Sequence, residues 1–437
     1  MRTISLIALA ALALASGCHD NGVGRLADGG PSDGGSDGGS DGGSDAGCIG
    51  GAELGAIGKH SLLVGALMDD STATAAAFDV RYVYLAGGLN EGTEPCTACG
   101  ATCSAKGHLC TAAGQCPWWG CFQYEVEKPG AYVRTFVAAA EGRSEIPMFT
   151  YAELFDASGA TSGPAAVAAA NDAALMSRYF NDFRFALQEI IAGRTVSSQK
   201  ALLHLEFGLW SAAQQVNADP HALPAAVASA NPTDCAAQEN SIAGLGKCLI
   251  AMTRKYAPGV LVGLHGVSYA SGTDVLLNTD PSLDPAAEAR KVAAFLSACG
   301  ASDGDFVATE TSDHDSGWYA SQGKNTAWDA TNATLPNFQQ AFAWAKALSE
   351  AVGKPIVYWQ TPLGNAAQAN APDHWRDNRV DYFFAHTDEL AAAHVIGVFF
   401  GSGAAPSEHP TLPETDGDNL ISKVRAYTAA GGQAVCP

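Results

Sequence analysis

The feature that most constrains the fold is a regular alternation of short apolar segments with longer alanine-rich stretches. Eight short segments are rich in Val, Ile, Leu and Phe and are bounded by Gly, Pro, Asp or Asn. They span residues 61–68, 79–85, 145–151, 201–206, 259–265, 305–310, 355–360 and 395–400. Near-continuous apolar content of this kind is typical of strands that are buried on both faces, as in a parallel sheet.

The stretches between these segments have the pattern of amphipathic helices. Apolar residues recur at three- and four-residue spacing, and Pro285 and Pro336 stand where a first helical turn tolerates proline. The predicted helices span residues 164–192, 241–256, 285–298, 336–352 and 378–393. Eight strands alternating with helices predict an α/β fold, a (β/α)8 TIM barrel over residues 48–437. A doubly wound open sheet is the alternative, but no GxGxxG motif follows the first strand.

The N-terminal segment has the pattern of an export signal. Residues 1–18 carry Arg2, then an apolar run too short to span a bilayer, then small residues. The sequence LASGC at 14–18 resembles a bacterial lipobox, which implies that Cys18 is lipidated; an ordinary signal peptide with a chance Cys is the alternative. Residues 19–47 are rich in Gly, Ser and Asp, a composition typical of a disordered tether. We therefore expect an exported lipoprotein, anchored to a membrane and facing the periplasm or the cell surface.

Cysteine usage agrees with export. The chain has 12 Cys, more than is usual in a reduced cytosolic enzyme. Six of them lie between Cys96 and Cys121, and we predict a disulfide-rich insertion over residues 91–128, after the second strand. Zinc binding is the alternative, but the irregular spacing does not match paired CxxC motifs.

The other cysteines of the body suggest two further disulfides. In a closed barrel the first and last elements are neighbours, so we predict a Cys48–Cys436 disulfide. Cys235 and Cys248 would close a short loop, which leaves Cys299 as a buried thiol.

The charge balance excludes one class of partner. Lys and Arg number 24 against 45 Asp and Glu, which gives a net charge of −21. Because a nucleic-acid-binding protein needs a basic face to neutralise phosphates, we expect no nucleic-acid partner.

Polar and aromatic residues gather where the predicted strands end. In a barrel of this kind the carboxyl ends of the strands form the active face. Carboxylates, amides and aromatic rings around one mouth are suited to a sugar, because rings stack on the pyranose and polar groups bind its hydroxyls. The predicted substrate-binding residues are Asp69, Tyr151, His204, Trp210, His265, Tyr269, Trp318, Trp359, Gln360 and Asn365.

Two carboxyl groups that flank a glycosidic bond supply the acid and the base or nucleophile of its hydrolysis. Glu206 is the predicted general acid, because strand alternation puts it on one face with His204 and burial would raise its pKa. Glu310 is the preferred partner, since it also closes its strand. Asp313 and Asp315 follow in a loop and are the other candidates.

At this level the body resembles the secreted (β/α)8 glycoside hydrolases. In their commonest retaining group an Asn-Glu pair ends strand four and a Glu ends strand seven. Here Leu205 precedes Glu206, and Gln360 stands on strand seven. The resemblance implies an enzyme that cleaves carbohydrates with two carboxyl groups. We further expect a monomer without a cofactor or a metal ion.

Three other functions remain open. A metal-dependent hydrolase would use His204, Glu206, His265, Glu310 and His314. A serine hydrolase would use Ser268, although the sequence after it does not have a helical pattern. A lipoprotein that binds glycans without cleaving them would use the same mouth.

Overall fold

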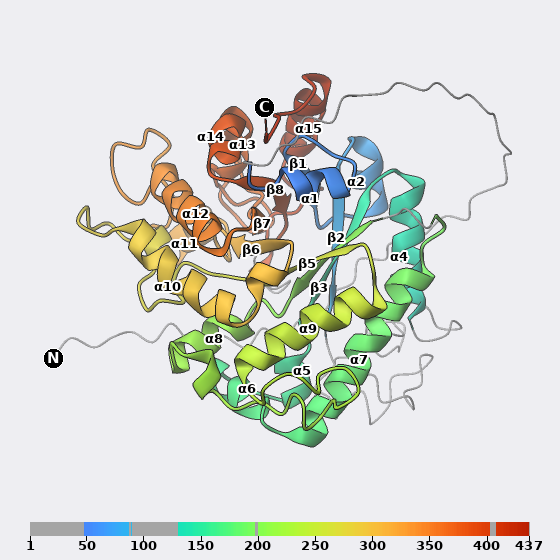
Figure 1. The fold of residues 1–437 in the computed structure, drawn as a ribbon. Coiled ribbons are helices and arrows are strands. Elements are labelled where there is room, and N and C mark those ends of the chain that lie inside the picture. The colour runs from blue at the N-terminus through green and yellow to red at the C-terminus, as the bar shows by residue number, and fades with distance from the viewer. Residues whose placement is uncertain (1–47, 87–88, 90–129, 197–199, 403–407, 437) are drawn as a thin grey trace, which may run out of the picture.

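The computed structural model describes residues 48–86, 89, 130–196, 200–402 and 408–436. Eight strands form a closed barrel in the order β1 to β8, and β1 pairs in parallel with β8. Helices surround the strands (Figure 1). The strands are β1 Leu63–Ala66, β2 Val80–Leu85, β3 Ile146–Tyr151, β4 Ala201–Leu205, β5 Val260–His265, β6 Phe306–Glu310, β7 Ile356–Thr361 and β8 Val395–Phe400. The predicted (β/α)8 barrel is confirmed.

Each predicted strand contains its observed strand, except that β7 extends to Thr361. The helices are α1 Gly51–Ala56, α2 Asp70–Ala75, α4 Ala131–Gly142, α5 Leu154–Ser158, α6 Gly163–Ala169, α7 Ala173–Ala192, α8 Leu209–Val216, α9 Ile242–Tyr256, α10 Pro285–Ala298, α11 Ser316–Ser321, α12 Phe338–Val352, α13 Arg379–Ala385, α14 Thr387–Ala392 and α15 Asn419–Ala429.

Two predicted helices are each divided in the structure. The stretch 164–192 forms α6 and α7, because Asp172 caps α7 by accepting hydrogen bonds from the backbone N–H groups of Ala174 and Leu175. The stretch 378–393 forms α13 and α14, which are separated at His386. An amphipathic pattern continues across such a break, so periodicity alone does not reveal it.

The two helix-start prolines differ in their positions. Pro285 occupies the first turn of α10 after the cap Asp284, as predicted. Pro336 precedes α12 instead. Asn337 is the cap of that helix, and its side chain accepts a hydrogen bond from the backbone N–H of Gln340.

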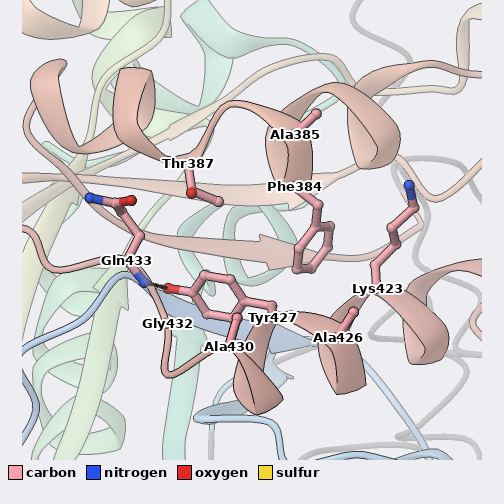
Figure 2. A pocket seen from close by; sticks show the side chains of 9 residues that line it. All are labelled: Phe384, Ala385, Thr387, Lys423, Ala426, Tyr427, Ala430, Gly432 and Gln433. Carbon is pink, nitrogen blue, oxygen red and sulfur yellow. Dashed lines mark hydrogen bonds between the residues drawn. The ribbon is translucent and has the colours of Figure 1, made fainter.

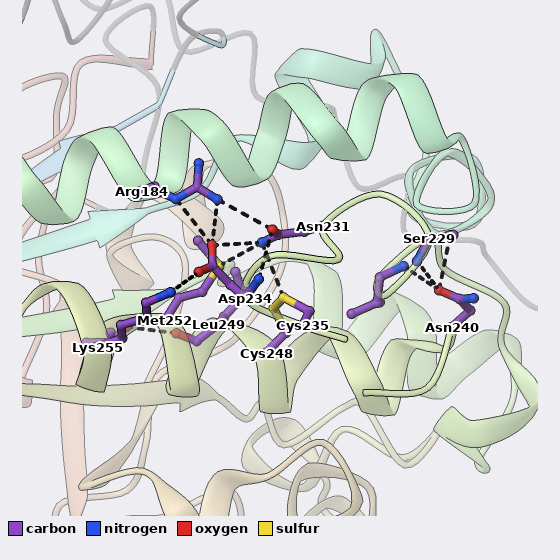
Figure 3. The surroundings of a disulfide bond; sticks show 12 residues. Arg184, Ser229, Asn231, Asp234, Cys235, Asn240, Cys248, Leu249, Met252 and Lys255 are labelled. Carbon is purple, nitrogen blue, oxygen red and sulfur yellow. Dashed lines mark hydrogen bonds and ion pairs between the residues drawn. A yellow bond between two sulfur atoms is a disulfide. The ribbon is translucent and has the colours of Figure 1, made fainter. Parts of the chain in front are cut away.

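The predicted disulfides of the described body are confirmed. Cys48 is joined to Cys436, which ties the chain before α1 to the chain after α15. Cys235 is joined to Cys248 on α9, and Cys299 is a buried free thiol. Figure 3 shows the Cys235–Cys248 disulfide beside Asp234. The predicted signal peptide, Cys18, the tether and the 91–128 insertion lie outside the described residues.

A cluster of charges stabilises the loop that carries Cys235. The buried Asp234 carboxylate pairs with Arg184 of α7 and with Lys255 of α9, at 2.5 and 2.6 Å (Figure 3). Burial opposes ionisation, but hydrogen bonds from Lys255 and Arg184 outweigh it and hold the pKa of Asp234 well below its usual range. The loop is therefore attached to two helices by charge as well as by the disulfide.

Side chains fill the interior of the barrel. Trp359 of β7 contacts Tyr82 and Tyr84 of β2 and His204 of β4, with ring centroids 6.2, 5.7 and 4.7 Å apart. Because these strands are not neighbours, the side chains meet inside the barrel. No helix among the described residues is long and apolar enough to cross a membrane.

Candidate active site

The floor of the candidate site is aromatic. Trp359 is fully buried, and its ring lies 5.3 Å from that of Phe207, just after β4. Phe207 and Tyr84 are partly exposed and their rings are 6.4 Å apart. Trp359 therefore supports the floor from below, and Phe207 and Tyr84 are the rings that face the solvent.

Two buried histidines lie beside Trp359. His204 Nε2 is 2.9 Å from His265 Nδ1, and His204 Nδ1 is 3.2 Å from the hydroxyl of Thr150 on β3. Burial lowers the pKa of both imidazoles, that of His265 to about 3. Both rings are therefore neutral at physiological pH and form one hydrogen-bonded chain across β3, β4 and β5.

Gln360 connects three parts of the mouth. Its Oε1 accepts a hydrogen bond from the Tyr84 hydroxyl at 2.8 Å, and its Nε2 donates to the Ser402 carbonyl at 2.8 Å. Its φ of 56° departs from the extended strand conformation, which turns the side chain after Trp359 into the mouth. Gln360 is thus held between β2 and the segment that follows β8.

Glu310 is a carboxyl group at the mouth of the barrel. It pairs in register with Trp359, and register partners on parallel strands share a face, so its side chain is directed into the barrel. It is partly exposed. Burial raises its pKa to about 8, and the nearby carboxylates of Asp313 and Asp274 add to this effect. Glu310 therefore keeps its proton at neutral pH.

Asp313 follows three residues later and has the opposite character. Its side chain is 56% exposed, and Oδ2 lies 3.3 Å from His314 Nδ1. The Tyr319 hydroxyl donates a hydrogen bond to Oδ1. Burial alone would raise the pKa of Asp313, but His314 and Tyr319 outweigh it and lower that pKa. Asp313 is therefore an ionised carboxylate close to a protonated one.

Further aromatic side chains border these carboxyl groups. Burial raises the pKa of Tyr269, which follows β5, and the charge of Glu310 adds a smaller effect. Trp318 of α11 stacks on His314 with centroids 3.9 Å apart. Both are partly exposed. The predicted site residues Tyr269, Trp318, Gln360, Glu310 and Asp313 thus belong to one mouth.

The prediction that His204 and Glu206 share one face is wrong. Glu206 has a φ of 49°, so strand alternation ends before it. Its Oε1 accepts hydrogen bonds from the backbone N–H groups of Glu153 and Leu154 and from the Tyr179 hydroxyl of α7, at 3.0, 3.3 and 2.8 Å. Burial does raise its pKa, to about 7. The carboxyl group nevertheless lies at the start of α5, and we assign it no catalytic role.

Two more predicted site residues pack among the helices. The Tyr151 hydroxyl donates to Asp182 of α7 at 2.9 Å, and its ring contacts Phe183 of the same helix. Trp210 lies in α8 and donates from Nε1 to the Leu205 carbonyl at 2.9 Å. Both are buried. Strand alternation places Tyr151 on the face opposite to Thr150, and therefore outside the barrel.

Three others hold loops in place. Asp69 caps α2 by accepting a hydrogen bond from the Thr72 N–H at 2.7 Å. Asp315 is buried and accepts from the Gly364 N–H at 2.7 Å, and burial raises its pKa to about 7. Asn365 donates to the Asp416 carbonyl at 2.6 Å. Their polar groups face backbone partners, so the structure does not bring them to Glu310.

Residues of the mouth that the sequence analysis missed include Tyr84, Phe207, Asp274 and Glu408. Tyr84 had a usable signal, since Tyr82 and Tyr84 alternate within a predicted strand. Asp274 had none, because it follows β5 by nine positions, in a loop whose path only the tertiary structure determines. Its Oδ1 accepts a hydrogen bond from the Ser268 hydroxyl at 3.0 Å.

Among the described residues, those expected for a metal-dependent hydrolase or a serine hydrolase are not arranged as either enzyme requires. Within the described part of the chain, no three His, Cys, Asp or Glu side chains are arranged to hold a metal ion. His204 and His265 are in the barrel, Glu206 is at α5, and His314 pairs with Glu408. Ser268 is followed by turns and not directly by a helix, so the context of a nucleophile elbow is missing there.

A surface hollow of about 390 Å³ lies elsewhere, between α13 and α15 (Figure 2). Its lining includes Phe384, Lys423 and Tyr427, and the Tyr427 hydroxyl accepts a hydrogen bond from the Gln433 N–H. No carboxylate or imidazole lines it. The hollow therefore lacks the pair of carboxyl groups that glycoside hydrolysis uses.

No protein-family model matches the chain, and no curated protein matches it. Solved structures of similar shape include an endo-1,4-β-D-mannanase from Thermotoga petrophila, with 11% identity, a TM-score of 0.46, and coverage of 84% of this chain and 99% of that one. A family GH26 β-mannanase from Bacteroides ovatus has 10% identity and a TM-score of 0.46, and covers 86% and 91%. A GH53 catalytic domain from Ignisphaera aggregans has 11% identity and a TM-score of 0.45, and covers 86% and 93%. These similarities are too low to indicate an activity, and the fold assignment rests on the closed sheet itself.

Proposed function

We propose that the protein is a glycoside hydrolase whose general acid is Glu310 and whose ionised carboxylate, acting as base or nucleophile, is Asp313. The observation that carries this proposal is the position of Glu310. It is a partly exposed carboxyl group at the end of β6, directed into the barrel among aromatic rings, with Asp313 close by in the following loop.

The two carboxyl groups differ in the way that glycoside hydrolysis requires. One group must donate a proton to the leaving oxygen while the other remains ionised. A pKa of about 8 keeps the proton on Glu310 at neutral pH, and the lowered pKa of Asp313 keeps that group charged. Environments that move two pKa values apart separate the roles of acid and base.

The surroundings favour a carbohydrate as the substrate. Partly exposed rings of Tyr84, Phe207 and Trp318 can stack on the apolar faces of sugar rings. The Gln360 amide lies beside Tyr84 and can bind a hydroxyl group. We further propose that the enzyme is an exported monomer, held at a membrane through a lipid on Cys18.

One observation favours a glycan-binding protein without catalysis. Asp313 Oδ1 accepts a hydrogen bond from Tyr319, and Oδ2 lies 3.3 Å from His314 Nδ1, so both oxygens already have a neighbour where a water or a sugar carbon would have to approach. In that case the same rings and amides would bind the glycan and release it unchanged.

The test is a panel of polysaccharides and aryl glycosides, assayed for released reducing ends or phenol. We expect cleavage of at least one substrate by the wild-type chain and loss of that activity in Glu310→Gln and in Asp313→Asn. Glu206→Gln is the matched control, since the pKa of Glu206 is raised like that of Glu310 but its side chain faces α7. Glycan binding without turnover would refute the hydrolase and support a glycan-binding protein without catalysis. Full activity in Glu310→Gln would refute Glu310 as the general acid.

A further inference from the structure

His314 joins two loops of the mouth that are far apart in the sequence. It lies in the loop after β6, and its Nε2 is 2.9 Å from Oε2 of Glu408, in the segment after β8. Its Nδ1 lies 3.3 Å from Asp313 Oδ2. The imidazole is therefore placed between two carboxylates, and it is only 10% exposed.

The imidazole is also fixed in orientation. The Trp318 ring stacks on it, with an interplanar angle of 21°, and the Tyr319 ring meets it edge-on at 5.4 Å. Tyr319 in turn donates its hydroxyl hydrogen to Asp313. Tyr319 of α11 thus contacts both Asp313 and His314, and Trp318 of the same helix contacts His314.

We propose that His314 is a positioning residue, which keeps Asp313 ionised and in place, and that Glu408 in turn holds His314. The proposal rests on the proposed function, because it assigns the support of the carboxylate that acts there. His314 itself need not touch the substrate.

The charges around His314 agree with this role. The groups that face it are Asp313 from its own loop, Tyr319 from α11, Glu408 from after β8 and, at longer range, Glu310 of β6. Burial alone would lower the pKa of His314, but Asp313 and Glu408 outweigh it and raise that pKa. A cationic His314 in turn lowers the pKa of Asp313. Removal of Glu408 should therefore lower the pKa of His314. Removal of His314 should raise the pKa of Asp313, so that Asp313 takes up a proton at higher pH.

The first experiment does not depend on activity. The imidazole resonances of the full-length protein are titrated by NMR, and the signal of His314 is identified by its absence in His314→Asn. We expect a midpoint above 6.5 in the wild type and a lower midpoint in Glu408→Gln. An unchanged midpoint in Glu408→Gln would overturn the role of Glu408. Glu408→Asp retains the charge and should restore most of the shift.

The second experiment is the pH profile of kcat/KM on the substrate found in the panel. We expect the acidic limb to move up by about one pH unit in His314→Asn and less in Glu408→Gln, with kcat reduced and KM close to wild type. His221→Asn is the matched control, because His221 also pairs with a carboxylate, Glu239, at 2.6 Å but on the surface. An unmoved acidic limb in active His314→Asn and Glu408→Gln enzymes overturns the positioning role alone. If no carbohydrate is cleaved, the proposed function fails. The NMR midpoint still decides whether Glu408 raises the pKa of His314.

Discussion

Replacement of Glu206 by Gln tests whether this carboxyl group has a structural or a catalytic role. The Glu206 side chain is 1% exposed in relative terms, and its Oε1 accepts three hydrogen bonds. Gln retains this acceptor oxygen but does not titrate. Because burial raises the pKa of Glu206 to about 7 from 4.5, its folded state retains a proton that the unfolded chain has already released. The wild-type protein therefore loses stability as the pH rises through this window.

The size of this stability loss follows from the pKa shift of Glu206. A raised carboxyl pKa contributes stability that is fully present below the unfolded value and is lost as the pH rises to the folded value. A shift from 4.5 to about 7 corresponds to a loss on the order of 3 kcal/mol. Glu206→Ala removes the acceptor altogether and leaves the buried N–H groups of Glu153 and Leu154 without it, at about 1–3 kcal/mol for each group.

The assay is denaturant unfolding of the wild type and of Glu206→Gln at two pH values, one below 4.5 and one above about 7. Other groups titrate in both proteins, so the measured quantity is the difference between their free energies of unfolding. We expect this difference to change by about 3 kcal/mol in favour of Gln at the higher pH. A difference that is constant with pH would refute the buried, protonated Glu206. Loss of hydrolysis in a folded Glu206→Gln protein would refute its structural role.

Three further predictions concern other parts of the molecule. Glu310→Gln should lower kcat/KM by about 10²–10⁴, and the wild-type kcat/KM should fall as the pH rises past about 8, because the acid then loses its proton; a pH profile without this basic limb would contradict the assignment. Replacing Cys48 and Cys436 by Ser should lower the free energy of unfolding by about 2–5 kcal/mol, and more than the same change at Cys235 and Cys248, because the sequence separations are 388 and 13; equal losses in denaturant unfolding would argue against this loop-length effect. The neutral His204–His265 pair should destabilise the fold as the pH drops below 6.5, since the unfolded imidazoles bind protons there and the buried ones do not; His265→Phe should reduce that slope in acid unfolding, and an unchanged slope would contradict the buried neutral pair.

Much of the fold could be predicted because its signals are local. A strand buried on both faces requires a continuous apolar run, and eight such runs were enough to predict the barrel. Closure of that barrel brings its first and last strands together, which is why the Cys48–Cys436 disulfide could also be predicted. Helix breaks were missed at Asp172 and His386, because neither interrupts the apolar periodicity of its stretch.

The site was predictable only in part, because side-chain direction at a strand end depends on one backbone angle. Glu310 ends β6 within the strand, and register with Trp359 directs it inward as expected. Glu206 lies one residue beyond β4 with a positive φ, and three hydrogen-bond donors of α5 and α7 hold it outside the barrel. From the sequence the two residues look equivalent.

The sequence by itself determined the barrel, the pairing of its ends and a carboxyl group at the end of β6, because burial and strand periodicity act on neighbouring residues. Only the tertiary structure decided which carboxyl groups share a mouth. Asp274, Asp313 and Glu408 come to Glu310 and His314 along loops whose paths depend on packing across the whole barrel. That packing also gives Glu310 and Asp313 opposite pKa shifts, the difference on which the proposed chemistry depends.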